Sequence, residues 1–263
     1  MSDINKPSGR LRFFDCNARV GRAGAVRPEH ILDPQRLIGE MDYCGIERAL
    51  VYHAWAREWD AASGNRKLLE EIEGLDRLAP CFCPLPHATE EMPPPEALAV
   101  DLKARRGAAR LYPKEHQYVL SEWCCGRLLS ALEDAGVPVL LEMAQASWDD
   151  IAGVLKAHPR LPVIVLGTSY RIDRYAYPLW ERFDNLHVET ATYQVMRGIE
   201  AVCRRFGPER LVFGTGLPLL DAGGPIAQVM YAELPEREKR LIAGGTLARL
   251  LGVEWPVEGG AEK

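Results

Sequence analysis

The chain has 263 residues, of which 47% are hydrophobic and 26% are charged, a composition typical of a globular protein with one sizeable core. The same figures exclude disordered, collagen-like and disulfide-scaffold proteins. The formal net charge of -5 is spread along the chain, so neither a nucleic acid nor a membrane is expected as a partner.

The chain is expected to be cytoplasmic. Its first ten residues are polar and no run of 18 apolar residues occurs, which predicts neither a secretion signal nor a membrane span. The seven cysteines are odd in number and form no C-x-x-C pair, as expected for buried thiols in a reducing compartment.

Eight short apolar runs follow one another along the chain, with helical patterns between them. The runs begin near Leu11, Glu47, Ala79, Ala108, Val137, Pro162, Leu186 and Arg210. The helical period is plainest from Trp148 to Leu155, between the cap Ser147 and the stop Pro159. A second helix is predicted from Ile199 to Phe206, ended by Gly207.

This alternation predicts an α/β fold, a single-domain (β/α)₈ TIM barrel. Runs that are apolar at every position, such as Val163 to Leu166, suit parallel strands covered on both faces. An open doubly wound sheet is the alternative, but no G-x-G-x-x-G follows the first run. We expect a flexible N-terminus over residues 1–9, the barrel over 10–256 and a flexible tail over 257–263. The proline-rich piece from Met92 to Pro95 is interpreted as a helix entry.

Polar residues gather where the predicted strands end. In such a barrel these ends form the active site, so their convergence marks a candidate site. A single polar residue there is more often simply solvated. The residues at these ends are Asp15, Asn17, Arg19, His53, His87, Tyr112, Lys114, His116, Glu142, Thr168, Tyr170, Arg171, Glu189 and Gly214 to Gly216.

Two segments resemble known motifs. Arg210 to Pro218 reads R-L-V-F-G-T-G-L-P and is similar to R-L-L-F-G-T-D-x-P, and Phe14 to Arg19 occupies the place of D-x-H-x-H. With Tyr43 to Val51 and Ala248 to Gly252, they make the chain resemble the amidohydrolase-2 family over nearly its whole length. The resemblance implies a (β/α)₈ barrel, hydrolase or decarboxylase activity, zinc or another divalent metal, and a homodimer.

At each position where the resemblance implies a metal ligand, this sequence has another residue. The replacements are Asn17, Arg19, Glu142, Thr168 and Gly216. An arginine cannot ligate a metal, and its fixed charge repels a cation. We therefore expect no metal and no other cofactor.

The first hypothesis is a metal-free hydrolase or decarboxylase for a small carboxylated or lactone-like molecule. Arg19 would face Glu142 across the mouth of the barrel and bind carboxylate or a developing oxyanion. The predicted catalytic residues are Arg19, His53, Glu142 and Glu189. The predicted substrate-binding residues are Asn17, Tyr112, Thr168, Arg171 and Gly216.

Three alternatives stay open. In the first, Arg19 and Glu142 form a buried ion pair that only neutralises the two charges and has no role in catalysis. A rebuilt metal site would use His53, His87, His116, Glu142 and Cys16. A non-catalytic barrel would bind a small molecule or a protein partner at its mouth.

Overall fold

The computed structural model describes residues 11–24, 27, 30 and 33–257. The predicted flexible N-terminus lies outside the described residues, and so does the predicted tail except for Val257. Within the described part, no helix combines the length and the apolar character needed to cross a membrane.

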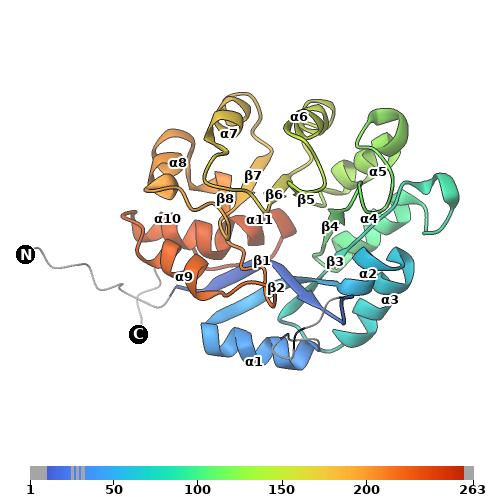
Figure 1. Ribbon diagram of the computed structural model, residues 1–263, viewed down its shortest axis with the longest axis horizontal. Helices are drawn as coiled ribbons and strands as arrows, with labels where there is room; N and C mark the ends of the chain where they lie inside the picture. The colour runs from blue at the N-terminus through green and yellow to red at the C-terminus, as the bar shows by residue number, and fades with distance from the viewer. Residues whose placement is uncertain (1–10, 25–26, 28–29, 31–32, 258–263) are drawn as a thin grey trace, which may run out of the picture.

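Eight parallel strands form one sheet in the order of the chain, and the helices surround it (Figure 1). This is the predicted (β/α)₈ barrel, and each strand begins within two residues of the start of a predicted apolar run. The strands are β1 (Phe13–Val20), β2 (Ile46–His53), β3 (Leu78–Phe82), β4 (Ala108–Leu111), β5 (Val139–Glu142), β6 (Val163–Leu166), β7 (Leu186–Glu189) and β8 (Leu211–Val212).

The helices lie between and after the strands. The α-helices are α1 (Pro34–Cys44), α2 (Ala54–Glu58), α3 (Ala61–Glu71), α4 (Pro95–Ala104), α5 (Glu122–Ala135), α6 (Trp148–Ala157), α7 (Asp173–Trp180), α8 (Gly198–Phe206), α9 (Gly223–Met230), α10 (Glu236–Arg240) and α11 (Thr246–Leu251). Two 3₁₀ turns, η1 (His87–Thr89) and η2 (Pro208–Arg210), and a π-helical segment, η3 (Leu241–Gly245), complete the chain.

The helix ends follow the local sequence signals. Ser147 and Asp150 form a reciprocal capping box at the start of α6, which confirms the predicted cap. Pro95 occupies the first turn of α4, as the proline-rich entry predicted. The helix predicted from Ile199 to Phe206 is α8, and Gly207 caps its end.

Backbone hydrogen bonds bring the first strand to the segment that follows the last one. Cys16 N donates to the Phe213 carbonyl at 3.0 Å, Gly216 N to Asn17 at 2.9 Å, and Arg19 N to Leu217 at 2.9 Å. The barrel is thus closed where β1 carries its polar residues, and residues 213–217 lie beside them.

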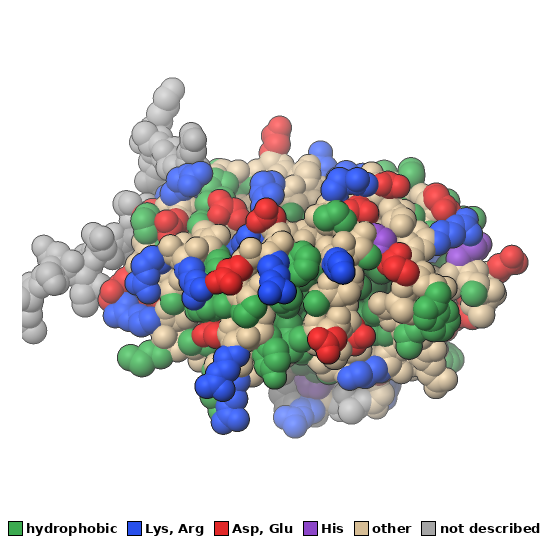
Figure 2. All heavy atoms as spheres, turned by 90° about the horizontal axis from the view of Figure 1, so that it is seen from above, with side chains coloured by type: hydrophobic (Ala, Val, Ile, Leu, Met, Phe, Trp, Pro, Cys, Tyr) green, Lys and Arg blue, Asp and Glu red, His purple; other side chains and the backbone are tan. Residues whose placement is uncertain are grey.

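Apolar side chains fill the sheet on both faces, as the continuous runs predicted. All four residues of β6 are buried, and so are the first three of β5. On the outside, Figure 2 shows basic and acidic side chains interspersed over one face of the molecule, with hydrophobic ones between them. That face carries no field of a single sign that would attract a polyanion.

The short helix α2 is held against α3 by a glycine. A Cβ atom at Gly64 would lie 2.1 Å from the backbone nitrogen of Ala56, so the two helices approach more closely than a side chain allows. This contact matters for the site because α2 carries Arg57 and Glu58 towards the mouth of the barrel.

We expect Gly64→Ala to lower the free energy of unfolding by about 1–3 kcal/mol, because the new methyl group must push α2 away from α3. Gly153→Ala in α6 is the matched control, since a Cβ there meets nothing within 4 Å. That change should stabilise the protein by about 0.5–1 kcal/mol through helix propensity. Urea unfolding of both variants checks this, and equal effects would refute the close-packing argument.

Candidate active site

A cavity of about 260 Å³ opens at the carboxyl ends of the strands, where a barrel of this kind places its active site. Seven of the eight strands, or the residues that follow them, contribute to its wall, together with α2. The lining residues are Asn17, Arg19, Tyr52, Arg57, Arg110, Glu142, Leu166, Gly167, Glu189, Thr192, Gly216, Leu217, Leu219 and Leu220.

The guanidinium group of Arg110 lies at the centre of the polar contacts. It comes from β4, and its side chain is 3% exposed. Nη1 donates to the side-chain oxygen of Asn17 at 2.7 Å, and Nη2 donates to the Glu142 carboxylate. The group also lies 4.3 Å from the centre of the Tyr52 ring, a cation–π contact. A buried charge persists only when it is compensated, and these contacts compensate Arg110.

Glu189 is a buried carboxyl group that faces the same cavity. One oxygen accepts a hydrogen bond from Asn17 Nδ2 at 2.6 Å, and the other accepts from the Gly167 backbone N–H at 3.2 Å. Gly214 leaves room for it, because a Cβ there would lie 2.4 Å from the carboxylate. Burial raises the pKa of Glu189 to about 7, although the bonds from Asn17 and Gly167 lower it. Glu189 can therefore hold or release a proton near neutral pH.

Asp15 fixes the position of Asn17 by hydrogen bonds. Its carboxylate accepts from the backbone N–H groups of Asn17 at 2.8 Å and Thr215 at 3.0 Å, and also from the Thr215 hydroxyl. Burial raises the pKa of Asp15 to about 6, against the lowering effect of the bonds from Thr215 and Asn17. These bonds join β1 to the segment after β8 and so orient Asn17 between Arg110 and Glu189.

Two further arginines line the cavity. Arg57 forms a bidentate pair with Glu115 at 2.9 and 2.8 Å, and its Nη1 lies 3.6 Å from Glu142. The Arg19 side chain is 5% exposed, and its Nη1 lies 3.8 Å from Glu58. Glu142 is therefore paired with Arg110 and Arg57, and the expected pair of Arg19 with Glu142 does not form. Arg110 forms the pair instead, because its side chain points into the barrel from β4, the strand that pairs with the strand of Glu142.

Five of the nine predicted site residues line the cavity together: Asn17, Arg19, Glu142, Glu189 and Gly216. Tyr112 is buried next to them, with its ring 5.5 Å from the Arg110 guanidinium. Thr168 is buried after β6, and its hydroxyl has no hydrogen-bond partner among the described residues. Arg171 is exposed and lies over the Tyr170 ring.

His53 lies outside the cavity lining. Its Nδ1 accepts from the Trp55 N–H at 3.1 Å and caps α2, while the ring packs against Gly21. Burial lowers the pKa of His53 to about 4, so the ring is neutral at physiological pH. The structure gives this histidine a helix-capping contact, which competes with a role as acid or base.

Sequence reasoning missed Arg110 and Arg57. Arg110 is the third residue of β4 and lies inside the apolar run. A search restricted to the residues at strand ends therefore did not include it. The signal that could have found it is a single charge in an otherwise apolar buried strand, because such a charge requires a partner in the interior. Arg57 lies on α2, a helix inserted directly after β2, which the sequence analysis did not separate.

The residues at the mouth do not fit a divalent cation. Arg110 already donates to the oxygens of Asn17 and Glu142, two of the positions where the resemblance implies metal ligands. Its permanent charge would repel a cation at that point. Of the histidines proposed for a rebuilt site, His116 binds the Arg57 carbonyl through Nε2 at 2.9 Å and His87 lies in η1. Throughout the residues that the structure describes, no three His, Cys, Asp or Glu side chains are grouped to hold a metal.

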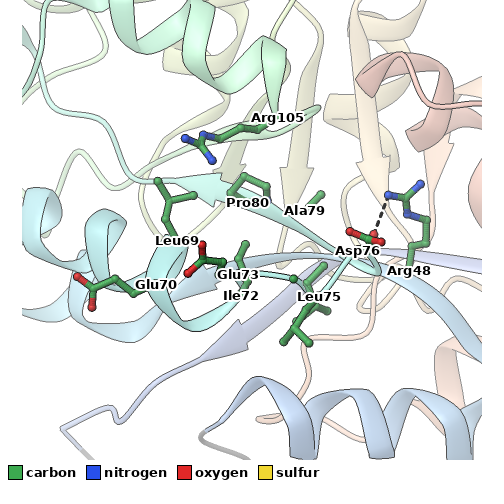
Figure 3. Close-up of a pocket in the computed structure, with 12 residues that line it drawn as sticks. Arg48, Leu69, Glu70, Ile72, Glu73, Leu75, Asp76, Ala79, Pro80 and Arg105 are labelled. Atoms are coloured by element: carbon green, nitrogen blue, oxygen red, sulfur yellow. Dashed lines mark hydrogen bonds between the residues drawn. The ribbon is translucent and has the colours of Figure 1, made fainter.

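A larger cavity, of about 580 Å³, lies at the opposite end of the barrel (Figure 3). It is lined by the start of β3 and by Arg48 at the start of β2, whose guanidinium donates to the Asp76 carbonyl at 2.9 Å. The amino ends of barrel strands contribute to stability rather than to catalysis. Size alone therefore does not identify the active site, and the smaller cavity at the carboxyl ends is the better candidate.

We expect Arg110→Met to lower the free energy of unfolding by about 3 kcal/mol, because it leaves Glu142 without its nearest cation. The double variant Arg110→Met with Glu142→Leu should lose less than the single variant, since no uncompensated charge remains. Thermal and urea unfolding of the wild type, of each single variant and of the double variant measure this. A double variant that loses the sum of both single changes would mean that the two side chains are not coupled.

The comparisons with known proteins agree with this barrel. No curated protein sequence matches the chain. The solved structure of 5-carboxyvanillate decarboxylase from Sphingomonas paucimobilis has a TM-score of 0.70 and 13% identity, over 93% of this chain and 100% of that one. The 2,6-dihydroxybenzoate decarboxylase from Rhizobium has a TM-score of 0.64 and 15% identity, over 92% and 98%.

A third solved structure was determined with ligands. It is 5-carboxyvanillate decarboxylase from Novosphingobium aromaticivorans, complexed with manganese and 4-hydroxy-3-methoxy-5-nitrobenzoic acid. Its TM-score is 0.70 and its identity 13%, over 92% of this chain and 96% of that one. At such identities the likeness shows the fold, whereas the family rests on the sequence. Residues 52–253 match the amidohydrolase family model, and since this is most of the chain, the protein belongs to the amidohydrolase family.

Proposed function

We propose that the protein is a metal-independent decarboxylase of small carboxylated molecules, acting in the cavity at the mouth of the barrel. The observation that carries the proposal is the meeting of three arginines and Glu189 in one small cavity. Arg19, Arg57 and Arg110 provide guanidinium groups, against two carboxyl groups among the lining residues. Glu115 and Glu58 next to the cavity balance part of this charge, so the arginines offer an anion hydrogen-bond donors more than a net positive charge.

The chemistry needs a proton donor and a site for negative charge. Protonated Glu189 would give its proton to the carbon atom that bears the leaving carboxylate. As the bond to the carboxylate carbon breaks, its electron pair forms the new bond between that carbon atom and the proton, and carbon dioxide leaves. Glu189 is then an anion and regains a proton from solvent. A buried carboxyl group with a pKa of about 7 suits this step, because it is protonated in a large share of the molecules at neutral pH.

The arginines would compensate the charge that the substrate brings into the cavity. Arg110 is held rigidly by Asn17 and Glu142, so it offers a fixed positive field with little reorganisation. Arg57 lies on the other side of Glu142. In this way the arginines would stabilise negative charge on the substrate, as a bound metal ion does in a metal-dependent enzyme.

The named activities of the structural neighbours support this choice of reaction. They are decarboxylases of 5-carboxyvanillate and 2,6-dihydroxybenzoate, which are carboxylated aromatic compounds. Hydrolysis of a lactone-like molecule, the other expected reaction, requires a base to activate water. Glu189 fits that role only when it has lost its proton, so its protonation state separates the two reactions.

We predict that Glu189→Gln lowers kcat/KM by at least about 100-fold, because glutamine cannot donate the proton. Carbon dioxide release from a panel of carboxylated phenols measures the activity. The control is Glu73→Gln, an exposed residue at the opposite end of the barrel, which should leave the rate unchanged. Full activity in a folded Glu189→Gln protein would remove Glu189 from the mechanism. A wild-type protein that binds these acids without turnover would instead support the non-catalytic barrel.

The pH dependence follows from the same group. Because Glu189 must be protonated to act as an acid, kcat/KM should be constant below its pKa of about 7 and fall tenfold per pH unit above it. A rate that rises with pH through this range would show that the ionised form is active and would favour hydrolysis. Steady-state rates from pH 5 to 9, in buffers of constant ionic strength, distinguish these outcomes.

A further inference from the structure

Another cavity, of about 420 Å³, lies at the amino end of the barrel. Its walls are formed by the segments that precede β6, β7 and β8, by the start of β7 and by α11. It shares no lining residue with the cavity at the mouth. A ligand bound here would therefore be distinct from the substrate of the proposed reaction.

His187 is a buried polar side chain in the wall of this cavity, and 4% of its surface is exposed. Its Nδ1 lies 2.7 Å from the carbonyl oxygen of Glu209. Because a carbonyl oxygen can only accept, Nδ1 carries the proton of the neutral ring. Nε2 then presents a lone pair, and it has no hydrogen-bond partner among the described residues. A buried acceptor of this kind calls for a donor from a ligand.

The charges that act on this ring are positive. Burial lowers the pKa of His187 to about 4, and the charges of Arg249 and Arg210 act in the same direction, although the bond to the Glu209 carbonyl raises it. The ring is therefore neutral at physiological pH. The two guanidinium groups would also repel a metal ion at Nε2. The ligand of this cavity is thus an anion that carries a hydrogen-bond donor.

Arg249 is the cation that can hold such an anion. It is exposed on α11, and it makes no hydrogen bond or ion pair with any residue that the structure describes. The other two arginines of the lining are paired with acids. Arg210 lies 2.7 Å from Asp184, and Arg160 lies 2.8 Å from Asp134.

Glu209 is the remaining acid of the lining, and its carboxylate is directed away from His187. A Cβ atom at Gly207 would lie 2.9 Å from that carboxylate. On α8, burial raises the pKa of Cys203 to about 12, and the nearby carboxylates that add to this effect include Glu209. The carboxylate therefore lies towards α8, and it leaves the space between His187 and Arg249 to an anion.

We propose that this cavity binds a phosphate group together with an O–H donor, with Arg249 holding the phosphoryl oxygens and His187 Nε2 accepting the O–H. Inorganic phosphate carries both features on one group, because it keeps a hydroxyl throughout the neutral range. A phosphorylated alcohol carries them on neighbouring groups, and the volume of the cavity leaves room for its carbon chain. Sulfate is also tetrahedral, but it has no proton to donate and would turn an oxygen lone pair towards Nε2.

The test compares inorganic phosphate with sulfate at pH 8 and equal ionic strength, by isothermal titration calorimetry of the whole chain. We expect phosphate to bind at least about tenfold more tightly, the effect of one hydrogen bond. His187→Asn should remove this preference, because the asparagine amide can still donate to the Glu209 carbonyl but places no acceptor where Nε2 was. Arg249→Gln should weaken phosphate binding by about tenfold. Arg36→Gln, at an exposed position on α1, is the control for the loss of one positive charge and should bind phosphate as the wild type does.

Equal binding of the two anions by the wild type would overturn the proposal. So would a preference that survives in His187→Asn, or phosphate binding that Arg249→Gln leaves unchanged, since the anion would then be held elsewhere. Thermal melting checks that His187→Asn is folded, and the exposed Arg249 keeps the test decisive if it is not.

Glycerol 3-phosphate separates the two sources of the phosphate group. Tighter binding than that of inorganic phosphate identifies a phosphorylated alcohol as the ligand, and weaker binding identifies inorganic phosphate. Neither measurement needs turnover, so this site is tested independently of the proposed decarboxylation.

Discussion

A guanidinium group buried at the mouth of the barrel is the constraint on which the site depends. Arg110 reaches the interior from β4, where its charge has to be compensated by protein groups. Asn17 and Glu142 accept from it, and Asn17 in turn donates to Glu189. Four residues from four strands are joined in this way, so a change at one of them alters the electrostatic field at the others.

This chain of contacts gives the two carboxyl groups of the cavity different partners. Glu142 is satisfied by Arg110 and Arg57, and it remains a fixed counter-charge. Glu189 is enclosed with only neutral donors in direct contact, and its pKa is accordingly raised. The two carboxyl groups of the cavity thus have different surroundings, with two guanidinium groups beside Glu142 and only neutral donors beside Glu189.

The sequence was sufficient for the fold because hydrophobic periodicity and helix caps are local signals. The eight strands, the capping box at Ser147 and the helix entry at Pro95 were all predicted. The site was predicted only in part. Glu142 and Glu189 follow from their places at strand ends and Asn17 from the resemblance of its segment to D-x-H-x-H, but the partner of Glu142 depends on side-chain reach across the barrel. Arg110 was overlooked for that reason, and Arg19 was paired with the wrong acid.

The account depends most on the claim that Arg110 stands where a resident metal would otherwise be needed. Elemental analysis by mass spectrometry, on untagged protein first saturated with zinc or manganese and then dialysed, tests it directly. The account predicts far less than one equivalent of any transition metal, with carbon dioxide release from carboxylated substrates unaffected by chelators. A stoichiometric metal that survives dialysis, and activity that depends on it, would contradict the account.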